Sequence, residues 1–453
     1  MGAFHAYDIR GVFGVDFDGD TAYRVGYFLP ELLSADRILV GRDCRVSSDE
    51  IHRRLVDGIT DAGADVCDIG LCTTPMVYFG TANYGFRASV QITASHNPAQ
   101  YNGMKVSREN ALPVGLDNGL GQIRDWIESG RACPPAKVKG QVHGMDIRKD
   151  YLDFLLKFKE DYSGLKIAMD LSNGMANLYA KEIFGSSPAY IFDEMDGRFP
   201  NHEPNPLVPA NVEALKKLVR ETGADVGVIY DGDADRVMFV DENARFISPD
   251  LMIAVLGHYF LQEKGEKGIV LQDIRSSKAV GEYLAPMGAE MKTWKVGRAF
   301  AARRLRELDG VYGGELAGHY YFRDFFYSDS GLLASILILN VIARKKSEGI
   351  SLGRLIAGIE KYRNSGEINF RVEDKAGAMD AVRDMFMSQE RHTAYMDFDG
   401  YRVEFPQWWF NIRPSNTEPY LRFICEATTD ELLRQKTDAV RTLLSSRFGA
   451  TVN

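Results

Sequence analysis

Three carboxylates at alternate positions of one short segment give the strongest chemical signal in the sequence. Asp231, Asp233 and Asp235 stand in Asp-Gly-Asp-Ala-Asp, between the apolar runs 226–230 and 237–240. Hard oxygen ligands on a tight loop suit Mg²⁺ or Ca²⁺, and three close carboxylates repel one another unless a cation is present. We therefore expect a divalent-metal site here, with a purely structural acidic turn as the alternative.

The same segment matches part of an EF-hand calcium loop. The three aspartates and Glu242 fall at loop positions 1, 3, 5 and 12. The match fails at position 6, where Arg236 replaces the required glycine, and strand-like runs stand where helices are needed. An EF-hand is therefore excluded.

A serine follows another short apolar run. Ser95 lies in Gln-Ile-Thr-Ala-Ser-His-Asn-Pro, residues 91–98, directly after the run 88–92. The hydroxyl is thus predicted at the carboxyl end of a strand, where open α/β sheets bind their ligands. The alternative is a turn whose side chains only satisfy the loop backbone.

Two further loops carry groups suited to a phosphorylated sugar. The segment 413–419 brings Arg413, two hydroxyls and an amide together, and arginine grips phosphate through two parallel hydrogen bonds. The segment 313–319 carries Glu315 and His319 among glycines, as an exposed backbone that approaches sugar hydroxyls would require. The alternatives are a polar hairpin turn and a pair of solvated side chains.

The elements that must position these loops follow one pattern three times. Each unit has an apolar run ending in Asp, a helical segment, and Gly-Ala before an acidic residue and a second apolar run. Strands that alternate with helices predict βαβ units and mostly parallel sheets, and a repeat of this length indicates a duplicated domain. The predicted first strands are 37–43, 166–170 and 268–273, and the closing signatures are 62–66, 222–226 and 287–291.

The last part of the chain has a different pattern. Polar and apolar residues alternate there, as in half-exposed antiparallel strands, and Thr428 to Glu431 forms a capping box that predicts a final helix to about 447. The predicted strands are 366–372, 400–405, 408–412 and 420–426. We thus predict three similar α/β domains with mixed, mostly parallel sheets and a C-terminal α+β domain, at 1–148, 149–249, 250–362 and 363–453.

Composition excludes several classes of protein. The net charge of −9 over 453 residues lacks the electrostatic footprint of a nucleic-acid binder. The apolar stretch 332–343 is far shorter than the roughly 20 residues of a membrane span and predicts a buried helix instead. The first ten residues lack the apolar run of a signal peptide, and five scattered cysteines without a C-x-x-C pair suggest neither disulfides nor zinc. We expect a cytoplasmic enzyme that acts on small molecules.

Taken along the chain, with one loop in each predicted domain, the four loops resemble those of the α-D-phosphohexomutase superfamily, in its phosphomannomutase/phosphoglucomutase branch. The resemblance spans nearly the whole chain and implies four domains around a central active-site cleft. It implies that Ser95 is a phosphoserine that, with Asp231, Asp233 and Asp235, binds Mg²⁺.

The resemblance also implies roles for other side chains. Arg10 and Lys105 match residues near the transferring phosphoryl group, and we assign His96 to the same catalytic group. Two departures stand out: Ala317 replaces a serine that normally helps to hold the sugar, and Arg298 stands where some relatives have histidine. The implied substrate contacts are Arg236, Arg275, Arg298, Glu315, His319, Arg413, Ser415, Asn416, Thr417 and Arg422.

The implied reaction is reversible phosphoryl transfer between the 1- and 6-positions of mannose or glucose phosphates. It would pass through phospho-Ser95 and a hexose 1,6-bisphosphate that turns end for end, in a monomer or homodimer. Phosphoglucosamine mutase is the nearest alternative; Thr93 and the run 319–323 argue against it. Two further alternatives belong to other classes. A metal-dependent phosphatase would need no second phosphate-binding site such as the segment 413–419, and a non-catalytic metal-binding protein would carry no phosphate on Ser95.

Overall fold

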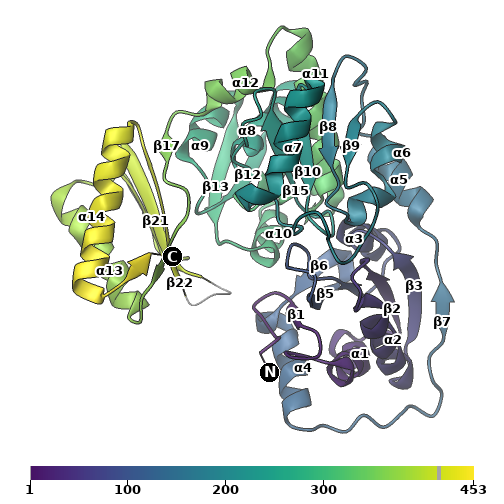
Figure 1. Ribbon diagram of the computed structural model, residues 1–453. Coiled ribbons are helices and arrows are strands. Elements are labelled where there is room, and N and C mark those ends of the chain that lie inside the picture. Colours follow the sequence, from purple (N-terminus) through teal and green to yellow (C-terminus); the bar gives the residue numbers. More distant parts are fainter. Residues whose placement is uncertain (1, 416–419, 453) are drawn as a thin grey trace.

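The computed structural model describes residues 2–415 and 420–452, which form four domains, each built around its own β-sheet (Figure 1). The first domain has a seven-stranded sheet in the order β1-β5-β4-β2-β3-β7, with β6 against β5. Strand β2 pairs in parallel with β3 and β4, whereas β5 pairs antiparallel with β1, β4 and β6. Its elements are β1 (Ile9–Val12), α1 (Gly19–Leu33), β2 (Arg37–Arg42), α2 (Ser48–Asp61), β3 (Asp65–Leu71), α3 (Thr74–Asn83), β4 (Ala88–Ile92), β5 (Tyr101–Arg108), β6 (Leu112–Val114), α4 (Leu120–Glu128) and β7 (Val142–Gly144).

The second domain repeats this plan with a smaller sheet. Its strand order is β11-β10-β8-β9, in which β8 pairs in parallel with β9 and β10, and β11 pairs antiparallel with β10. The tight antiparallel connection between β10 and β11 carries the three aspartates. The elements are α5 (Arg148–Leu156), β8 (Ile167–Asp170), α6 (Ala180–Phe184), β9 (Ala189–Ile191), α7 (Pro209–Thr222), β10 (Val226–Tyr230) and β11 (Val237–Asp241).

The third domain has the strand order β13-β12-β14-β15-β16, again with a parallel centre and an antiparallel edge. The mixed, mostly parallel sheets predicted for the repeated units are confirmed. The predicted buried helix is α11, which begins after Ser330, whose side chain accepts a hydrogen bond from Leu333 N. The elements are α8 (Leu251–Gly257), β12 (Gly268–Asp273), α9 (Lys278–Leu284), β13 (Ala289–Trp294), α10 (Arg298–Glu307), β14 (Tyr312–Gly314), β15 (Tyr320–Phe322), β16 (Ser328–Asp329), α11 (Gly331–Ser347) and α12 (Leu352–Ile359).

The C-terminal domain is the predicted α+β unit. Its seven strands are all antiparallel, in the order β19-β20-β21-β22-β18-β23 with β17 against β22, and two helices cover one side in Figure 1. The elements are β17 (Arg363–Asn364), β18 (Ile368–Arg371), α13 (Lys375–Gln389), β19 (Ala394–Met396), β20 (Tyr401–Glu404), β21 (Trp408–Pro414), β22 (Tyr420–Ala427), α14 (Asp430–Phe448) and β23 (Thr451–Val452).

The cap of the final helix differs by one residue from the prediction. Thr429, and not Thr428, is the N-cap of α14, and its side chain accepts from Leu432 N. Thr428 is held instead by the sheet, because its N–H donates to Gln407 O at 2.9 Å.

The structure bears on two classes considered above, membrane-spanning proteins and disulfide-linked proteins. None of the helices formed by the described residues is long and apolar enough to cross a membrane. The five cysteines all carry free thiols.

Candidate active site

The acidic loop between β10 and β11 is fully buried. Asp231, Asp233 and Asp235 are each 0% exposed, and one carboxylate oxygen from each lies within 4.8 Å of the others. Asp233 Oδ1 and Asp235 Oδ1 accept no hydrogen bond from the described part of the chain. Buried carboxylate oxygens without donors are costly unless a cation compensates them. The donor set therefore fits a hard divalent cation.

One lysine partly neutralises this loop. Lys105 Nζ donates to Asp233 Oδ2 at 2.7 Å and to Asp235 Oδ2 at 2.6 Å. Burial, with repulsion from Asp235 and Asp233, raises the pKa of Asp231 well above its ordinary value. Burial acts in the same direction on Asp235, but Lys105 and His319 lower its pKa to about 2. On the Asp231 side the Arg236 guanidinium lies farther off, with its Nε 3.8 Å from Asp231 Oδ2, so Asp231 is less closely paired with a cation than Asp233 and Asp235 are.

Ser95 lies on that side. It follows β4, is 1% exposed, and its Oγ donates to Asp231 Oδ2 at 2.7 Å across the boundary between the first two domains. His96 Nδ1 lies 3.4 Å from the same Oγ. Burial and the nearby Arg236 and Arg10 lower the pKa of His96 well below its ordinary value, so its imidazole is neutral at neutral pH. The predicted serine and aspartates are therefore in direct contact.

Arg10 reaches this serine loop from the neighbouring strand pair. It lies on β1 opposite Gly103 of β5, and its guanidinium donates to Asn97 Oδ1 at 2.8 Å while it pairs with Asp8. Its Nε is buried without a partner among the described residues. This leaves a guanidinium group with hydrogen-bonding capacity beside the serine loop.

The third domain brings the segment 313–319 directly against the acidic loop. Arg236 and His319 form a β-bridge, and His319 Nδ1 lies 3.9 Å from Asp235 Oδ1. The same nitrogen hydrogen-bonds Asp329 Oδ2 at 2.6 Å, and Asp329 Oδ1 accepts from Arg298 Nε at 2.9 Å. A chain of polar contacts therefore runs from Arg298 through Asp329 and His319 to the acidic loop.

Glu315 is not on an exposed loop, as the glycine pattern had led us to expect. It is 1% exposed, and its carboxylate accepts from Gly297 N at 2.7 Å and from Tyr321 OH at 2.6 Å. The reason is the antiparallel pairing of β14 with β15, which folds the loop back onto the sheet. Each carboxylate oxygen has two lone pairs, so Glu315 keeps the capacity to accept from a ligand.

Three arginines gather where the C-terminal domain meets the third domain. Arg413 and Arg422 are directly opposite each other on β21 and β22, and Arg275, on the loop after β12, is paired with Asp273 at 2.8 Å. Glu367 lies 2.8 Å from Arg422 Nη1 and 3.8 Å from Arg275 Nη1. Burial, and then repulsion from Arg275, lower the pKa of Arg413. Crowded guanidinium groups of this kind favour an anion.

The rest of this predicted loop is only partly described. Ser415 is half-buried, and its N–H donates to Tyr420 O at 2.8 Å. Asn416 and Thr417 lie outside the described residues.

Sequence reasoning missed the groups that hold the predicted side chains in place. Thr74 Oγ1 donates to Asp233 Oδ2 at 2.5 Å, Asp329 connects His319 to Arg298, and Asp399 Oδ1 lies 3.7 Å from Arg413 Nη1. The only local signal for any of them is that Asp329 directly precedes the cap of the long buried helix α11.

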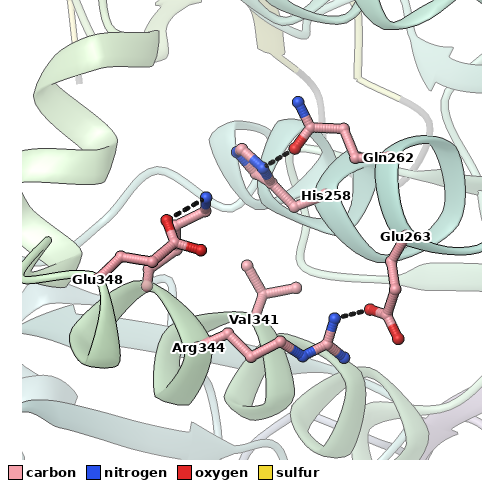
Figure 2. Close-up of a pocket in the computed structure, with 7 residues that line it drawn as sticks. His258, Gln262, Glu263, Val341, Arg344 and Glu348 are labelled. Atoms are coloured by element: carbon pink, nitrogen blue, oxygen red, sulfur yellow. Dashed lines mark hydrogen bonds and ion pairs between the residues drawn. The ribbon is translucent and has the colours of Figure 1, made fainter.

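A hollow on the outer surface of the molecule is a less suitable site. It has a volume of about 190 Å³ and lies between α11 and the π-helical turn 258–263 (Figure 2). Its polar side chains are already paired, since Arg344 contacts Glu263, Lys345 contacts Glu348 at 2.8 Å, and His258 contacts Gln262 at 2.5 Å. The residues that line it are His258, Gln262, Glu263, Val341, Arg344, Lys345 and Glu348, none of which the sequence had indicated.

The site combines a buried hydroxyl, an acidic loop in contact with it and a separate group of arginines. On a four-domain α/β chain, this combination is that of an enzyme of phosphoryl transfer. Comparison with known proteins makes this specific. Models of phosphoglucomutase/phosphomannomutase alpha/beta/alpha domains I, II and III match residues 1–131, 149–244 and 248–362, and that of the C-terminal domain matches 367–443. The chain belongs to the phosphoglucomutase/phosphomannomutase family, whose members are isomerases that transfer phosphoryl groups in hexose phosphates.

Individual relatives cover the chain almost completely. A phosphomannomutase of Escherichia coli is 36% identical over 97% of this chain and 98% of its own. A phosphohexose mutase of Xanthomonas campestris is 37% identical over 98% and 99%. The crystal structure of a phosphoglucomutase/phosphomannomutase family protein from Burkholderia thailandensis superposes with a TM-score of 0.87, at 28% identity, over 100% of this chain and 99% of that one. The resemblance inferred from the four loops is confirmed, as is the four-domain fold.

Proposed function

We propose that this enzyme moves a phosphoryl group reversibly between the 1- and 6-positions of mannose and glucose phosphates, through phospho-Ser95 and a hexose 1,6-bisphosphate. The observation that carries the proposal is the hydrogen bond from Ser95 Oγ to Asp231 Oδ2, 2.7 Å long, beside two carboxylate oxygens that accept no hydrogen bond from the residues that the structure describes. The names of the relatives, phosphomannomutase and phosphohexose mutase, support the choice of substrates.

Asp231, Asp233, Asp235 and the phosphate on Ser95 are the proposed ligands of Mg²⁺. When bound, this ion supplies positive charge that neutralises the oxygens of the transferring phosphoryl group. Lys105 orients Asp233 and Asp235 through its two short hydrogen bonds. Arg10, which contacts Asn97 of the serine loop, and Arg236, which lies near Asp231, would stabilise further negative charge on the phosphoryl oxygens.

The proposed chemical step needs a proton acceptor near Ser95. A free sugar hydroxyl attacks phosphorus, the bond from phosphorus to Ser95 Oγ breaks, and the hydroxyl gives up its proton. His96 Nδ1 lies 3.4 Å from Oγ and its imidazole is neutral, so it would take this proton from the sugar hydroxyl and return it to the serine oxygen. Lys105 is the alternative proton carrier, which as a cation would first donate to the serine oxygen and then take the proton of the sugar hydroxyl.

The arginine group of the C-terminal domain is proposed to hold the phosphate that does not react. Arg413, Ser415 and Arg422, together with Arg275, would bind either end of the bisphosphate, so that both orientations can be accepted. Glu315 and His319 would contact the sugar ring between the two sites. Asn416 and Thr417 are assigned to the same phosphate grip. We divide the chain functionally at 1–148, 149–249, 250–362 and 363–453.

The decisive experiment follows phosphate on Ser95. Purified protein incubated with glucose 1,6-bisphosphate should gain one phosphoryl group, located on Ser95 by peptide mass spectrometry, and Ser95→Ala should fold but lose nearly all turnover. Phosphate on no residue after this incubation would contradict the mechanism.

The same preparation separates the alternative functions. Release of inorganic phosphate in place of an isomeric hexose phosphate would indicate a phosphatase. Faster turnover of glucosamine phosphates than of mannose or glucose phosphates would indicate a phosphoglucosamine mutase.

A further inference from the structure

Arg45, which the proposed mechanism does not use, holds the backbone of the serine loop. Its side chain is 0% exposed. The two Nη atoms donate to four backbone carbonyls of the segment 95–101, at distances between 2.7 and 2.9 Å. The acceptors are Ser95 O, Asn97 O, Pro98 O and Tyr101 O. Together with the bond from Nε to Asp43, all five N–H donors of the guanidinium are used.

The guanidinium is itself fixed on its other sides. Asp43 Oδ2 accepts from Arg45 Nε at 3.2 Å, and Asp43 Oδ1 accepts from Arg45 N at 3.0 Å and from Ser48 Oγ at 2.6 Å. Phe199 of the second domain lies under the guanidinium plane, 4.9 Å from ring centre to Cζ. The Arg45 side chain is therefore held in one position, and the backbone of the serine loop folds around its guanidinium group.

Ser95 needs such support because of its backbone conformation. Its φ of 50° is in the left-handed region, which is unfavourable for a residue that carries a side chain. Four carbonyl dipoles that converge on one point also repel one another unless a cation lies between them. Arg45 supplies that cation.

The conformation of Ser95 decides where its hydroxyl points. Its carbonyl faces Arg45 and also packs against Gly232 of the acidic loop, where an added Cβ would lie 2.5 Å from Ser95 O. Its Oγ meanwhile donates to Asp231 Oδ2. A rotation of the Ser95 peptide would therefore turn the hydroxyl away from Asp231 or drive the carbonyl into the acidic loop.

We propose that Arg45 is the positioning residue of the phosphoserine loop, which it shapes so that Ser95 Oγ faces the acidic loop. The inference rests on the proposed role of Ser95 as the phosphoryl carrier. Arg45 touches backbone carbonyls and not the reacting atoms, so its loss should slow phosphoryl transfer to and from Ser95. Binding of hexose phosphate by the arginine group of the C-terminal domain should be unaffected.

The test compares Arg45→Lys with a matched control. A lysine keeps the positive charge but cannot serve four carbonyls in fixed directions. The control is Arg37→Lys at the first residue of β2, because Arg37 also donates to a backbone carbonyl, Tyr84 O at 3.1 Å, and lies over an aromatic ring, Phe86 at 4.5 Å. Each protein is assayed for phosphorylation of Ser95 by glucose 1,6-bisphosphate, followed by intact mass over time, for kcat and KM, and for its thermal midpoint.

In Arg45→Lys we expect the loading rate and kcat to fall about ten- to a hundredfold, since misplacement of a reacting group by about 1 Å has effects of this size. The KM should stay within about threefold of wild type, and Arg37→Lys should behave as wild type. Wild-type loading in folded Arg45→Lys, or a loss confined to KM, would overturn the inference.

A second variant covers the case in which Arg45→Lys does not fold. Asp43→Asn keeps the oxygen that binds Arg45 N and Ser48 but places an N–H donor against Arg45 Nε, which should loosen the guanidinium. We expect a smaller loss of loading rate at unchanged KM, and an unchanged loading rate overturns the inference. Absence of phosphate on wild-type Ser95 would instead overturn the proposed function, and the inference with it.

Discussion

The first three domains and the C-terminal domain are joined to the molecule in different ways. One continuous cluster of buried apolar residues runs from Leu39 in the first domain to Ile359 in the third. The buried apolar residues of the C-terminal domain form a cluster of their own, from Ile368 to Ala450. Figure 1 shows the same division, with the C-terminal sheet set to one side of the other three. The acidic loop lies on the shared core, since Tyr230 and Val237 belong to it. Strand β4, which precedes Ser95, packs in a further cluster of the first domain, and the strands that carry Arg413 and Arg422 pack in the C-terminal cluster.

The contact between the third and C-terminal domains is largely polar. Arg402 Nη1 donates to Ile274 O at 2.9 Å and to Ser276 O at 2.7 Å, and Ser277 Oγ donates to Glu426 at 2.8 Å. These bonds hold the loop that carries Arg275. Polar contacts exchange with water at little net cost, whereas a shared apolar core resists separation. We therefore expect the acidic loop and Arg275 to stay fixed, and Arg413 and Arg422 to move with the C-terminal domain.

The largest effect should come from the acidic loop. Asp233→Asn removes a charge from a preorganised site, and turnover should fall by about a thousandfold. Excess chelator should abolish turnover, with Mg²⁺ restoring it. The matched control is Asp193→Asn, whose parent residue is also paired with a lysine, Lys181 at 2.7 Å, but near the surface; it should change little. Full turnover in chelator, or an unchanged rate in Asp233→Asn, would contradict the metal assignment.

The polar contact to the C-terminal domain should depend on pH through Glu426. Burial and the nearby Asp250 raise its pKa from 4.5 to about 7. Between these two values the folded protein holds a proton that the unfolded chain has released, so the free energy of unfolding falls as pH rises from about 4.5 to 7 and is level above. The loss is up to about 3 kcal/mol.

Urea unfolding between pH 4.5 and 8 checks this. Other groups titrate too, so the informative quantity is the difference between wild type and Glu426→Gln, which cannot ionise at this position. That difference should grow in favour of the variant as pH rises to 7. Parallel curves for the two proteins would show that folding does not raise the pKa of Glu426.

Arg413→Ala should act on binding and leave the chemistry almost intact. Loss of a charge-assisted hydrogen bond to phosphate should raise KM for hexose phosphates by an amount equivalent to roughly 1.5–3 kcal/mol, with kcat changed much less. Arg371→Ala, at an exposed arginine of the same sheet, is the control. A fall in kcat as large as that of Asp233→Asn would show that the two regions do not have separate roles.

The sequence predicts most of the fold and most of the candidate site for one physical reason. Parallel strands bring their carboxyl ends to one edge of a sheet, so polar residues just after an apolar run are near a ligand. Ser95, Asp231 and Glu315 follow β4, β10 and β14 in this way. Their identity and approximate place are therefore visible in local patterns.

What supports these residues was not predictable from local patterns. Asp329 and Asp399 contact site residues only because separate segments of the same domain fold together. The four carbonyls around Arg45 belong to a loop about 50 positions away in the chain. The same limit explains why Glu315 was expected to be exposed: the burial comes from the pairing of β14 with β15, which the glycines do not reveal.

The smallest predicted effect concerns the contacts to the sugar ring, which would lie between the acidic loop and the arginine group. Ala317 is half-buried on the loop between β14 and β15, beside Glu315 and His319, at the position where the resemblance to the family implies a serine that would help to hold the sugar. Ala317→Ser should therefore raise kcat/KM, by about 0.5–1.5 kcal/mol for one hydrogen bond. Ala317→Gly is the control, because it changes size without adding a hydroxyl.

The same variant tests how the enzyme treats the two sugars. Glucose and mannose differ only at C2, and no residue is assigned to contact C2. Wild type should therefore accept both 1-phosphates, and the gain in kcat/KM from Ala317→Ser should be equal for the two. Discrimination above a hundredfold would require roughly 2.7 kcal/mol of differential transition-state binding. If competition assays find it, an unassigned contact to C2 exists, and Arg298 and Arg275 are the first residues to replace.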